Sequence, residues 1–300
     1  MIEQQREAAL LALQGTALGD GFGQSFASTP EAPEALLARR ELPPGPWRWS
    51  DDTMMASAIA EVLLMRGRVD QDELARSFAR RFAEQPTRGY GAMAHHILTR
   101  IVHGDPWRKA REVYRGQGSM GNGAAMRVCP AGAYFFEDPA LAVDAAVASA
   151  EITHAHPEGK AGATAVAAAA AWLKARQGQD HEPDGLLEFV QTMTPVGQVH
   201  DGLRAARRAA GWRPAEVAEV LGDGSQMLAP DTVPFALWVV AHFGRSFEDA
   251  QFAAMEGLLA PSADRDTVCA IVGGLVALRV GRAGLPAPWL LRCEALPLSV

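Results

Sequence analysis

Apolar residues recur at the period of an α-helix along nearly the whole chain, and runs that alternate apolar and polar residues between turns are missing. Aromatic residues make up only 7% of the composition, while alanine is abundant. A core of small side chains closes by packing helices at short distance rather than by filling space with rings. We therefore expect one all-α domain spanning residues 1–300, without a linker or a fixed-period repeat.

The same periodicity places the individual helices and the segments between them. Residues 7–18 form a buried first helix that ends near Gly19, and residues 30–46, rich in proline and charge, form an exposed loop. Residues 116–123 hold four glycines and form no regular element. The further predicted helices span residues 52–66, 70–82, 92–102, 141–152, 160–176, 186–193, 203–210, 231–243, 247–259 and 267–280.

Composition excludes several classes of protein. A net charge of −7 without a basic tract argues against nucleic-acid binding. Cys129, Cys269 and Cys293 are too few and too far apart for a disulfide framework or a four-cysteine zinc site. The polar N-terminus does not resemble a signal peptide, and apolar segments such as residues 161–173 are too short to span a membrane. We expect a soluble, cytoplasmic monomer.

Two segments place adjacent or alternate aspartates at the start of an apolar helix: Ser50-Asp51-Asp52-Thr53 and Asp264-Arg265-Asp266-Thr267. Either segment alone is well explained by helix capping, because acids in the first turn complement the positive end of the helix dipole. Together they supply enough carboxylate and hydroxyl oxygens for a pair of hard divalent cations such as Mg²⁺ or Mn²⁺. Both interpretations remain open from the pattern alone, with Arg265 expected to neutralise the acids.

The glycine cluster at residues 116–123 offers backbone amides that no side chain blocks, which is typical of a phosphate-binding loop. A flexible surface loop is the alternative, although the apolar segment that follows favours an ordered loop. Arg127 in that segment is expected to pair with a buried acid or to meet ligand. His154 is expected to line a pocket. A nucleophile elbow, a P-loop and a dinucleotide fingerprint are missing from the sequence, which disfavours the corresponding chemistries.

In chain order, these segments resemble the motifs of the ADP-ribosylglycohydrolase family. The resemblance runs nearly end to end, and the segment from Gly121 to Arg127 is its most specific part. The six matching segments are 15–23 (GTALGDGFG), 50–53 (SDDT), 88–91 (RGYG), 121–127 (GNGAAMR), 153–154 (TH) and 264–267 (DRDT).

The resemblance implies an all-α fold, two Mg²⁺ or Mn²⁺ ions, and hydrolysis that releases ADP-ribose from an acceptor. ADP-ribosyl-arginine on protein is the first choice, and another ADP-ribose conjugate, such as a serine-linked or nucleic-acid-linked one, is the alternative. Asp51 or Asp52 would position or deprotonate the attacking water. The implied metal ligands are Ser50, Asp51, Asp52, Asp264, Asp266 and Thr267. The implied substrate-binding residues are Ser119, Gly121, Asn122, Gly123, Met126, His154 and Tyr90, with the diphosphate on Ser119 and Gly121 to Gly123.

Two departures from the family pattern bear on the chemistry. Many members have a glutamate a few residues after the position of Gly23, whereas residues 24–28 contain no acid and Glu31 is the nearest. Ser262-Ala263 replaces the usual pair of glycines before the second aspartate segment. The missing glutamate keeps a non-catalytic ADP-ribose-binding protein as an alternative. A dinuclear phosphohydrolase that cleaves the diphosphate is another.

Overall fold

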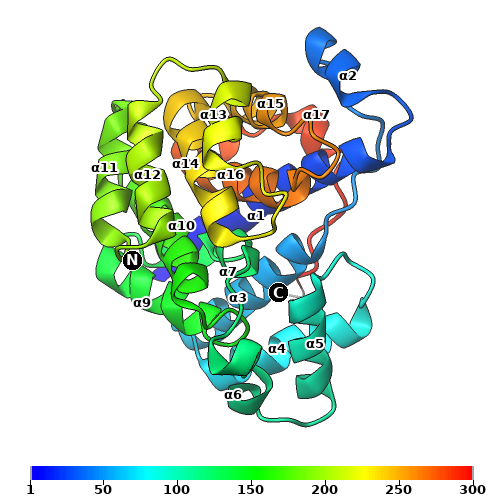
Figure 1. The fold of residues 1–300 in the computed structure, drawn as a ribbon, viewed down its shortest axis with the longest axis vertical. Coiled ribbons are helices and arrows are strands. Elements are labelled where there is room, and N and C mark those ends of the chain that lie inside the picture. The colour runs from blue at the N-terminus through cyan, green and yellow to red at the C-terminus, as the bar shows by residue number, and fades with distance from the viewer. Residues whose placement is uncertain (1, 299–300) are drawn as a thin grey trace.

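The computed structural model describes residues 2–298. Glycines spaced four residues apart in its first helix bring that helix into direct backbone contact with a second long helix. A Cβ atom at Gly15, Gly19 or Gly23 of the first helix, α1 (Ile2–Ser28), would collide with backbone carbonyls of α16 (Arg265–Val280). The partners of these glycines step backwards along α16 as the chain advances, so the two helices are antiparallel. Their contact is the most extensive helix–helix contact among the described residues (Figure 1).

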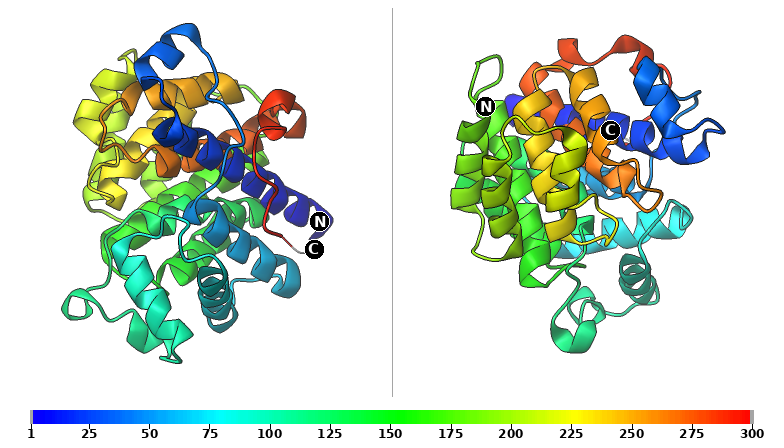
Figure 2. Two further views of the ribbon diagram at one scale, coloured as in Figure 1. Left: turned by 90° about the vertical axis from the view of Figure 1, so that its right-hand side faces the viewer. Right: turned by 45° about the horizontal axis from the view of Figure 1, so that its top comes forward.

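The remaining helices surround this pair and share one large hydrophobic core (Figures 1 and 2). The elements are α1 (Ile2–Ser28), α2 (Pro33–Arg39), α3 (Asp51–Arg66), α4 (Gln71–Glu84), α5 (Ala92–Val102), α6 (Trp107–Ala110), η1 (Tyr114–Gly116), α7 (Gly123–Met126), α8 (Cys129–Tyr134), α9 (Pro139–Ala150), α10 (Pro157–Ala175), α11 (Pro183–Met193), α12 (Gln198–Arg208), α13 (Pro214–Leu221), α14 (Ala229–Phe243), α15 (Phe247–Gly257), α16 (Arg265–Val280), η2 (Arg282–Gly284) and α17 (Ala287–Leu290).

The all-α prediction is confirmed: over residues 2–298 the only β-type pairings are two isolated bridges, Trp47 with Cys293 and Gly121 with Leu228. In this range no helix is long and apolar enough to cross a membrane. The α10 helix, which is alanine-rich and almost entirely buried, packs against α8, α9, α14 and α16. Its small side chains allow these neighbours to approach closely.

Two local predictions are wrong. The first helix does not end near Gly19 but continues to Ser28, because the close packing against α16 compensates for the low helix propensity of glycine. Residues 30–46 are not wholly a loop, since they contain the short helix α2, which has Pro33 as its first residue. Projecting from the body in Figure 1, α2 packs against α15.

Candidate active site

Both aspartate segments open into a cavity of about 550 Å³, a volume in the range of small-molecule sites. Its wall combines the starts of α3 and α16, the glycine-rich loop, the residues before α5 and the segment 226–228. Of the described residues in this wall, four are aspartates and none is lysine or arginine. The polar lining residues are Asp51, Asp52, Tyr114, Gln117, Ser119, Asn122, His154, His156, Gln226, Asp264, Asp266 and Thr267.

The start of α3 is capped by Ser50 and by Asp20, a buried residue of α1. The Ser50 hydroxyl accepts a hydrogen bond from the amide of Asp52 at 3.2 Å. The Asp20 carboxylate accepts from the amides of Ser50 and Thr53 at 2.9 and 3.1 Å, and from the Thr53 hydroxyl at 2.6 Å. Capping of α3 therefore does not use the carboxylates of Asp51 and Asp52, which remain available to the cavity.

The second segment reaches the first across the cavity floor. Asp264 is the N-cap residue of α16, and its Oδ2 accepts from the side-chain Nδ2 of Asn122 at 2.7 Å. The Thr267 hydroxyl lies 3.4 Å from Asp52 Oδ1, so the two helix starts are in contact. Arg265 does not neutralise the acids as expected: its guanidinium donates to the carbonyls of Leu258, Leu259 and Ala260 after α15.

Five carboxyl groups meet here, and their pKa values are shifted together. Burial, with repulsion from neighbouring acids, raises the pKa of Asp20 to about 7 and of Asp264 to about 8. The same two causes raise the pKa of Asp51 and Asp52 well above the ordinary aspartate value. Asp266 contributes to the repulsion at all four groups. Nearby cations would stabilise the ionised form of such a cluster.

The donor set fits the divalent cations that the resemblance implies. Carboxylate oxygens of Asp20, Asp52 and Asp266 lie within 4.8 Å of one another. Asp52 Oδ2 is buried and has no hydrogen-bond partner among the described residues. An all-oxygen set of this kind suits Mg²⁺ or Mn²⁺. Sequence reasoning missed Asp20, although the residue stands inside the motif at 15–23, because only the fold brings it beneath the two segments.

The glycine-rich loop is ordered by contacts on both sides. Ser119 Oγ accepts from the Gly121 amide at 3.1 Å, and Gly121 pairs with Leu228. Gly118 has a φ of +82°, and a side chain there would collide with Ala155. Gly123 ends the loop and is the first residue of α7, and its backbone amide has no acceptor among the described residues. The loop thus presents its backbone to the cavity, as a phosphate-binding loop does.

The expected substrate-binding residues do not all reach the cavity. Ser119, Gly121, Asn122, Gly123, Met126 and His154 line it. Tyr90 does not: it is buried against Phe82, with the ring centroids 5.0 Å apart, and burial raises the pKa of its phenol. Its neighbours Gly89 and Gly91 lie in the cavity wall instead.

No acid from the end of α1 enters the cavity lining of the described chain. Gln24 and Ala27 are exposed at that end of the helix. Glu31, the acid nearest in sequence to the usual glutamate, forms an exposed ion pair with Arg39 of α2. The aspartates of the two segments and Asp20 are consequently the acids available for chemistry at this site.

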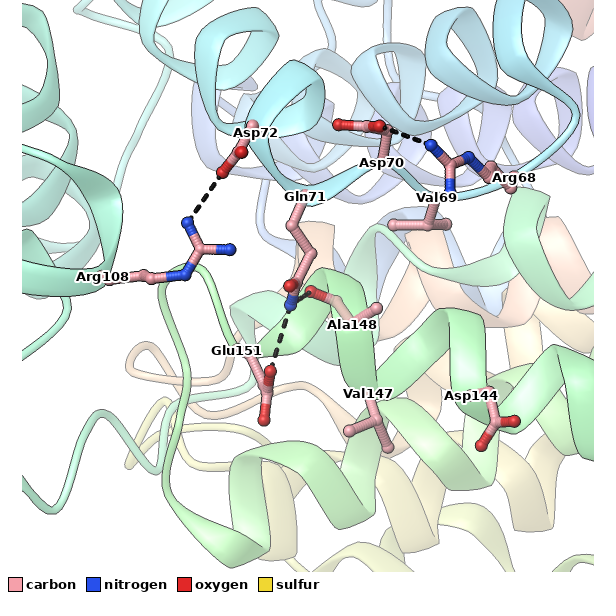
Figure 3. A pocket seen from close by; sticks show the side chains of 10 residues that line it. All are labelled: Arg68, Val69, Asp70, Gln71, Asp72, Arg108, Asp144, Val147, Ala148 and Glu151. Atoms are coloured by element: carbon pink, nitrogen blue, oxygen red, sulfur yellow. Dashed lines mark hydrogen bonds and ion pairs between the residues drawn. The ribbon is translucent and has the colours of Figure 1, made fainter.

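A second hollow lies between the start of α4 and α9 and is lined by charged residues (Figure 3). Arg68 pairs with Asp70 at 3.1 Å, and Arg108 with Asp72 at 2.9 Å. Arg68, Asp72 and Arg108 are largely exposed and Asp70 is half-buried. The four side chains meet in pairs rather than at a common centre. We assign no site to this surface.

Comparison with known proteins agrees with the geometry. Residues 1–298 match the ADP-ribosylglycohydrolase family. The chain is 26% identical to "ADP-ribosylhydrolase ARH3" of Danio rerio, covering 95% of this chain and 86% of the relative, and 27% identical to the Homo sapiens protein of that name, covering 94% and 88%. It is 29% identical to "ADP-ribosyl-[dinitrogen reductase] glycohydrolase" of Rhodospirillum rubrum over 50% of this chain and 52% of that protein.

A solved structure described as "ADP-ribosylglycohydrolase-related protein complex" is similar, with a TM-score of 0.69 and 26% identity over 97% of this chain and 94% of that one. The helical fold and the match along nearly the whole chain therefore define a member of a family of hydrolases. The chain belongs to the ADP-ribosylglycohydrolase family.

Proposed function

We propose that this chain releases ADP-ribose from an acceptor by hydrolysing the bond between the anomeric carbon of the ribose and the acceptor atom. The observation that carries the proposal is the position of four aspartates beside a glycine-rich loop in the wall of one cleft, with the buried Asp20 next to two of them. The carboxylates suit divalent cations that assist the hydrolysis, and the loop suits the diphosphate of the substrate.

The proposed cation ligands come from both aspartate segments, with Asp20 added to the residues expected from the sequence. Bound there, two Mg²⁺ or Mn²⁺ ions would orient ribose hydroxyls and the attacking water and make that water more acidic. The carboxylates around them would offset the positive charge that develops at the anomeric carbon. The full proposed set is Asp20, Ser50, Asp51, Asp52, Asp264, Asp266 and Thr267.

Asp51 and Asp52 are the proposed catalytic residues, which position the attacking water and accept its proton. Their availability supports this role, since α3 is capped by other groups and no glutamate from α1 enters the described cavity lining. The diphosphate would lie against the loop at residues 121–123, because the described wall offers it no lysine or arginine. The backbone amide of Gly123 would donate to it, since those of Gly121 and Asn122 already donate to Ser119 and Met227. Met126 and His154 would contact the remainder of the ADP-ribose.

ADP-ribosyl-arginine on protein is the proposed substrate, with the arginine side chain as the acceptor. An acidic cleft lined by no lysine or arginine in its described wall is compatible with a guanidinium group. In each case the bond that is cleaved starts at the anomeric carbon of the ribose, whatever the acceptor. The test therefore compares substrates that differ only in the acceptor group.

The experiment incubates the full chain with Mg²⁺ and either arginine-linked or serine-linked ADP-ribosylated peptide, followed by mass spectrometry of the products. Free ADP-ribose with restored arginine is the expected result. Release of ADP-ribose from the serine-linked peptide alone would show that serine, not arginine, is the acceptor, and would leave the proposed reaction unchanged. AMP would indicate cleavage of the diphosphate, and ADP-ribose binding without any product would indicate a non-catalytic binding protein.

A further inference from the structure

Arg127, Thr153 and His154 form a hydrogen-bonded series that runs from the core to the wall of the cleft. Arg127 and Thr153 have no exposed surface, and His154 is 4% exposed. Arg127 Nη1 donates to Thr153 Oγ1 at 2.9 Å, and Thr153 Oγ1 lies 2.8 Å from His154 Nδ1. The family motif at 153–154 therefore has a third member, supplied by a buried arginine 26 residues away.

The chemistry of the three groups decides the direction of the hydrogen bonds. A guanidinium has donors only, so the Thr153 oxygen must accept from Arg127. The buried hydroxyl proton then has one acceptor among the described residues, His154 Nδ1. If Nδ1 carried a proton instead, this hydroxyl proton would be left without a partner inside the core. Nδ1 is thus an acceptor, and the imidazole proton lies on Nε2.

We propose that Arg127 and Thr153 are positioning residues that hold His154 as a neutral imidazole protonated on Nε2, so that the cleft receives a fixed hydrogen-bond donor at this point. The inference deepens the proposed function and rests on it in one respect: the atom that meets Nε2 is an acceptor of ADP-ribose, a phosphate or ribose oxygen or a ring nitrogen. A ligand that presents a donor there is disfavoured.

Arg127 is itself held in place on several sides. Its Nη2 donates to the carbonyl of Ser149 at 2.7 Å, its Nε donates to the Ser149 hydroxyl at 3.3 Å, and its guanidinium lies 4.5 Å from the centre of the Phe78 ring. Burial, assisted by the charge of Arg127, lowers the pKa of His154 to about 3. The ring is therefore uncharged at neutral pH, in agreement with the bond directions.

Nε2 faces two glycines of the phosphate-binding loop. A Cβ atom at Gly123 would lie 2.9 Å from Nε2, and one at Gly121 would lie 3.2 Å from it. Nε2 makes no hydrogen bond to another described residue. The loop thus leaves room at this nitrogen, and the donor is directed toward the place where the proposed ligand meets the glycines.

The test is a long-range ¹⁵N–¹H correlation spectrum of the ligand-free full chain with ¹⁵N-labelled histidine at pH 7. The His154 signals are assigned by their loss in His154→Gln. We expect the pattern of a neutral ring protonated on Nε2. His103 serves as an internal reference, because its Nδ1 lies 2.7 Å from the Thr99 carbonyl and must donate to it. A His154 ring protonated on Nδ1, or an imidazolium, would overturn the proposal.

Two variants test the role of the hydroxyl. Thr153→Ser keeps it, and we expect the tautomer to be retained, with ADP-ribose affinity within about twofold of the original. Thr153→Val removes it, and we expect a mixture of tautomers and affinity lower by about tenfold. Unchanged tautomer and affinity in a folded Thr153→Val protein would exclude the positioning role. Because the tautomer is read without substrate, it separates failure of this inference from failure of the proposed hydrolysis.

Discussion

Arg88 and Glu294 are 206 residues apart in sequence and form a two-pronged ion pair, with both nitrogen–oxygen distances at 2.8 Å. Arg88 also lies over the Trp49 ring at 3.7 Å, and Trp49 donates to the carbonyl of Ala295. The carbonyl of Arg88 in turn accepts from the amide of Asp51 at 2.8 Å. The segment after α17 is thereby linked to Asp51, the first residue of α3.

Glu294→Ala is expected to weaken this link. Because Arg88 would lose its partner while about seven-eighths buried, we expect a loss of about 1–3 kcal/mol in the free energy of unfolding. We also expect Mn²⁺ affinity to fall several-fold, since Asp51 is less firmly held. Chemical denaturation and calorimetric titration measure the two effects. Arg204→Ala breaks an exposed pair with Asp201 and should cost less than about 0.5 kcal/mol. Equal effects of both variants would refute the link.

Asp20→Asn tests the residue that the fold adds to the site. Asparagine cannot accept all three donors that Asp20 receives, and it brings no negative charge to the cluster. We expect Mn²⁺ affinity to drop at least about tenfold and stability to fall by about 1–3 kcal/mol. Calorimetric titration of Mn²⁺ into Asp20→Asn checks this, with Asp249→Asn as the exposed control. Unaltered affinity would remove Asp20 from the ligand set.

Asp266→Ala is expected to abolish metal-dependent turnover, because Asp266 is one of the three acids whose oxygens lie closest together. We expect a loss of at least about a hundredfold in kcat/KM, a size typical of removing a principal electrostatic contact. Release of ADP-ribose at saturating Mg²⁺ is the measurement. Full activity in this variant would contradict the assignment of the second segment.

Metal binding should depend on pH, because the cation competes with protons for the same carboxylates. The pKa of Asp20 is raised to about 7 and that of Asp264 to about 8, so we expect Mn²⁺ affinity to increase between pH 6 and pH 8. Calorimetry in buffers of different ionisation enthalpy should detect proton release on binding. A flat affinity profile with no proton release would show that these groups are already ionised.

The metal-free protein should show the opposite trend in stability. Since the folded state holds protons that the unfolded state has lost above the ordinary pKa of 3.8, the stabilisation is complete below that value and is lost as pH rises toward about 8. Denaturation of metal-free protein from pH 5 to pH 8 should therefore show decreasing stability, and added Mn²⁺ should reverse the decrease. Stability that rises over this range without metal would contradict the raised pKa values.

Gly19→Ala is expected to disrupt the contact between α1 and α16, because a Cβ there collides with the carbonyl of Cys269. We expect a loss of about 1–3 kcal/mol, the cost typical of overpacking. Gly185 lies in an exposed turn of α11, where a Cβ would meet only the Trp172 ring at an ordinary contact distance of 4.0 Å, so Gly185→Ala should stabilise by about 0.5–1 kcal/mol. Thermal unfolding distinguishes the two, and a neutral Gly19→Ala would show that the helices can separate.

Local pattern was sufficient for most helix positions, because apolar periodicity and capping depend on neighbours within a few residues. The predicted helix at residues 92–102 coincides with α5, and the helix predicted at residues 52–66 ends where α3 does, at Arg66. Pattern was insufficient at Gly19, where propensity favours a helix end. The contact with α16 outweighs that preference, and such a contact cannot be read from the segment itself.

The sequence by itself determined the all-helical class, the family, and the two aspartate segments with the glycine-rich loop between them. The tertiary structure alone decided which groups meet at the site. It brought Asp20 under both segments, turned Arg265 to the carbonyls after α15, buried Tyr90 away from the cavity, and joined Arg127 to His154. The physical reason is that burial, charge and hydrogen-bond partners belong to positions in space, which residues far apart in the chain reach only when the helices pack.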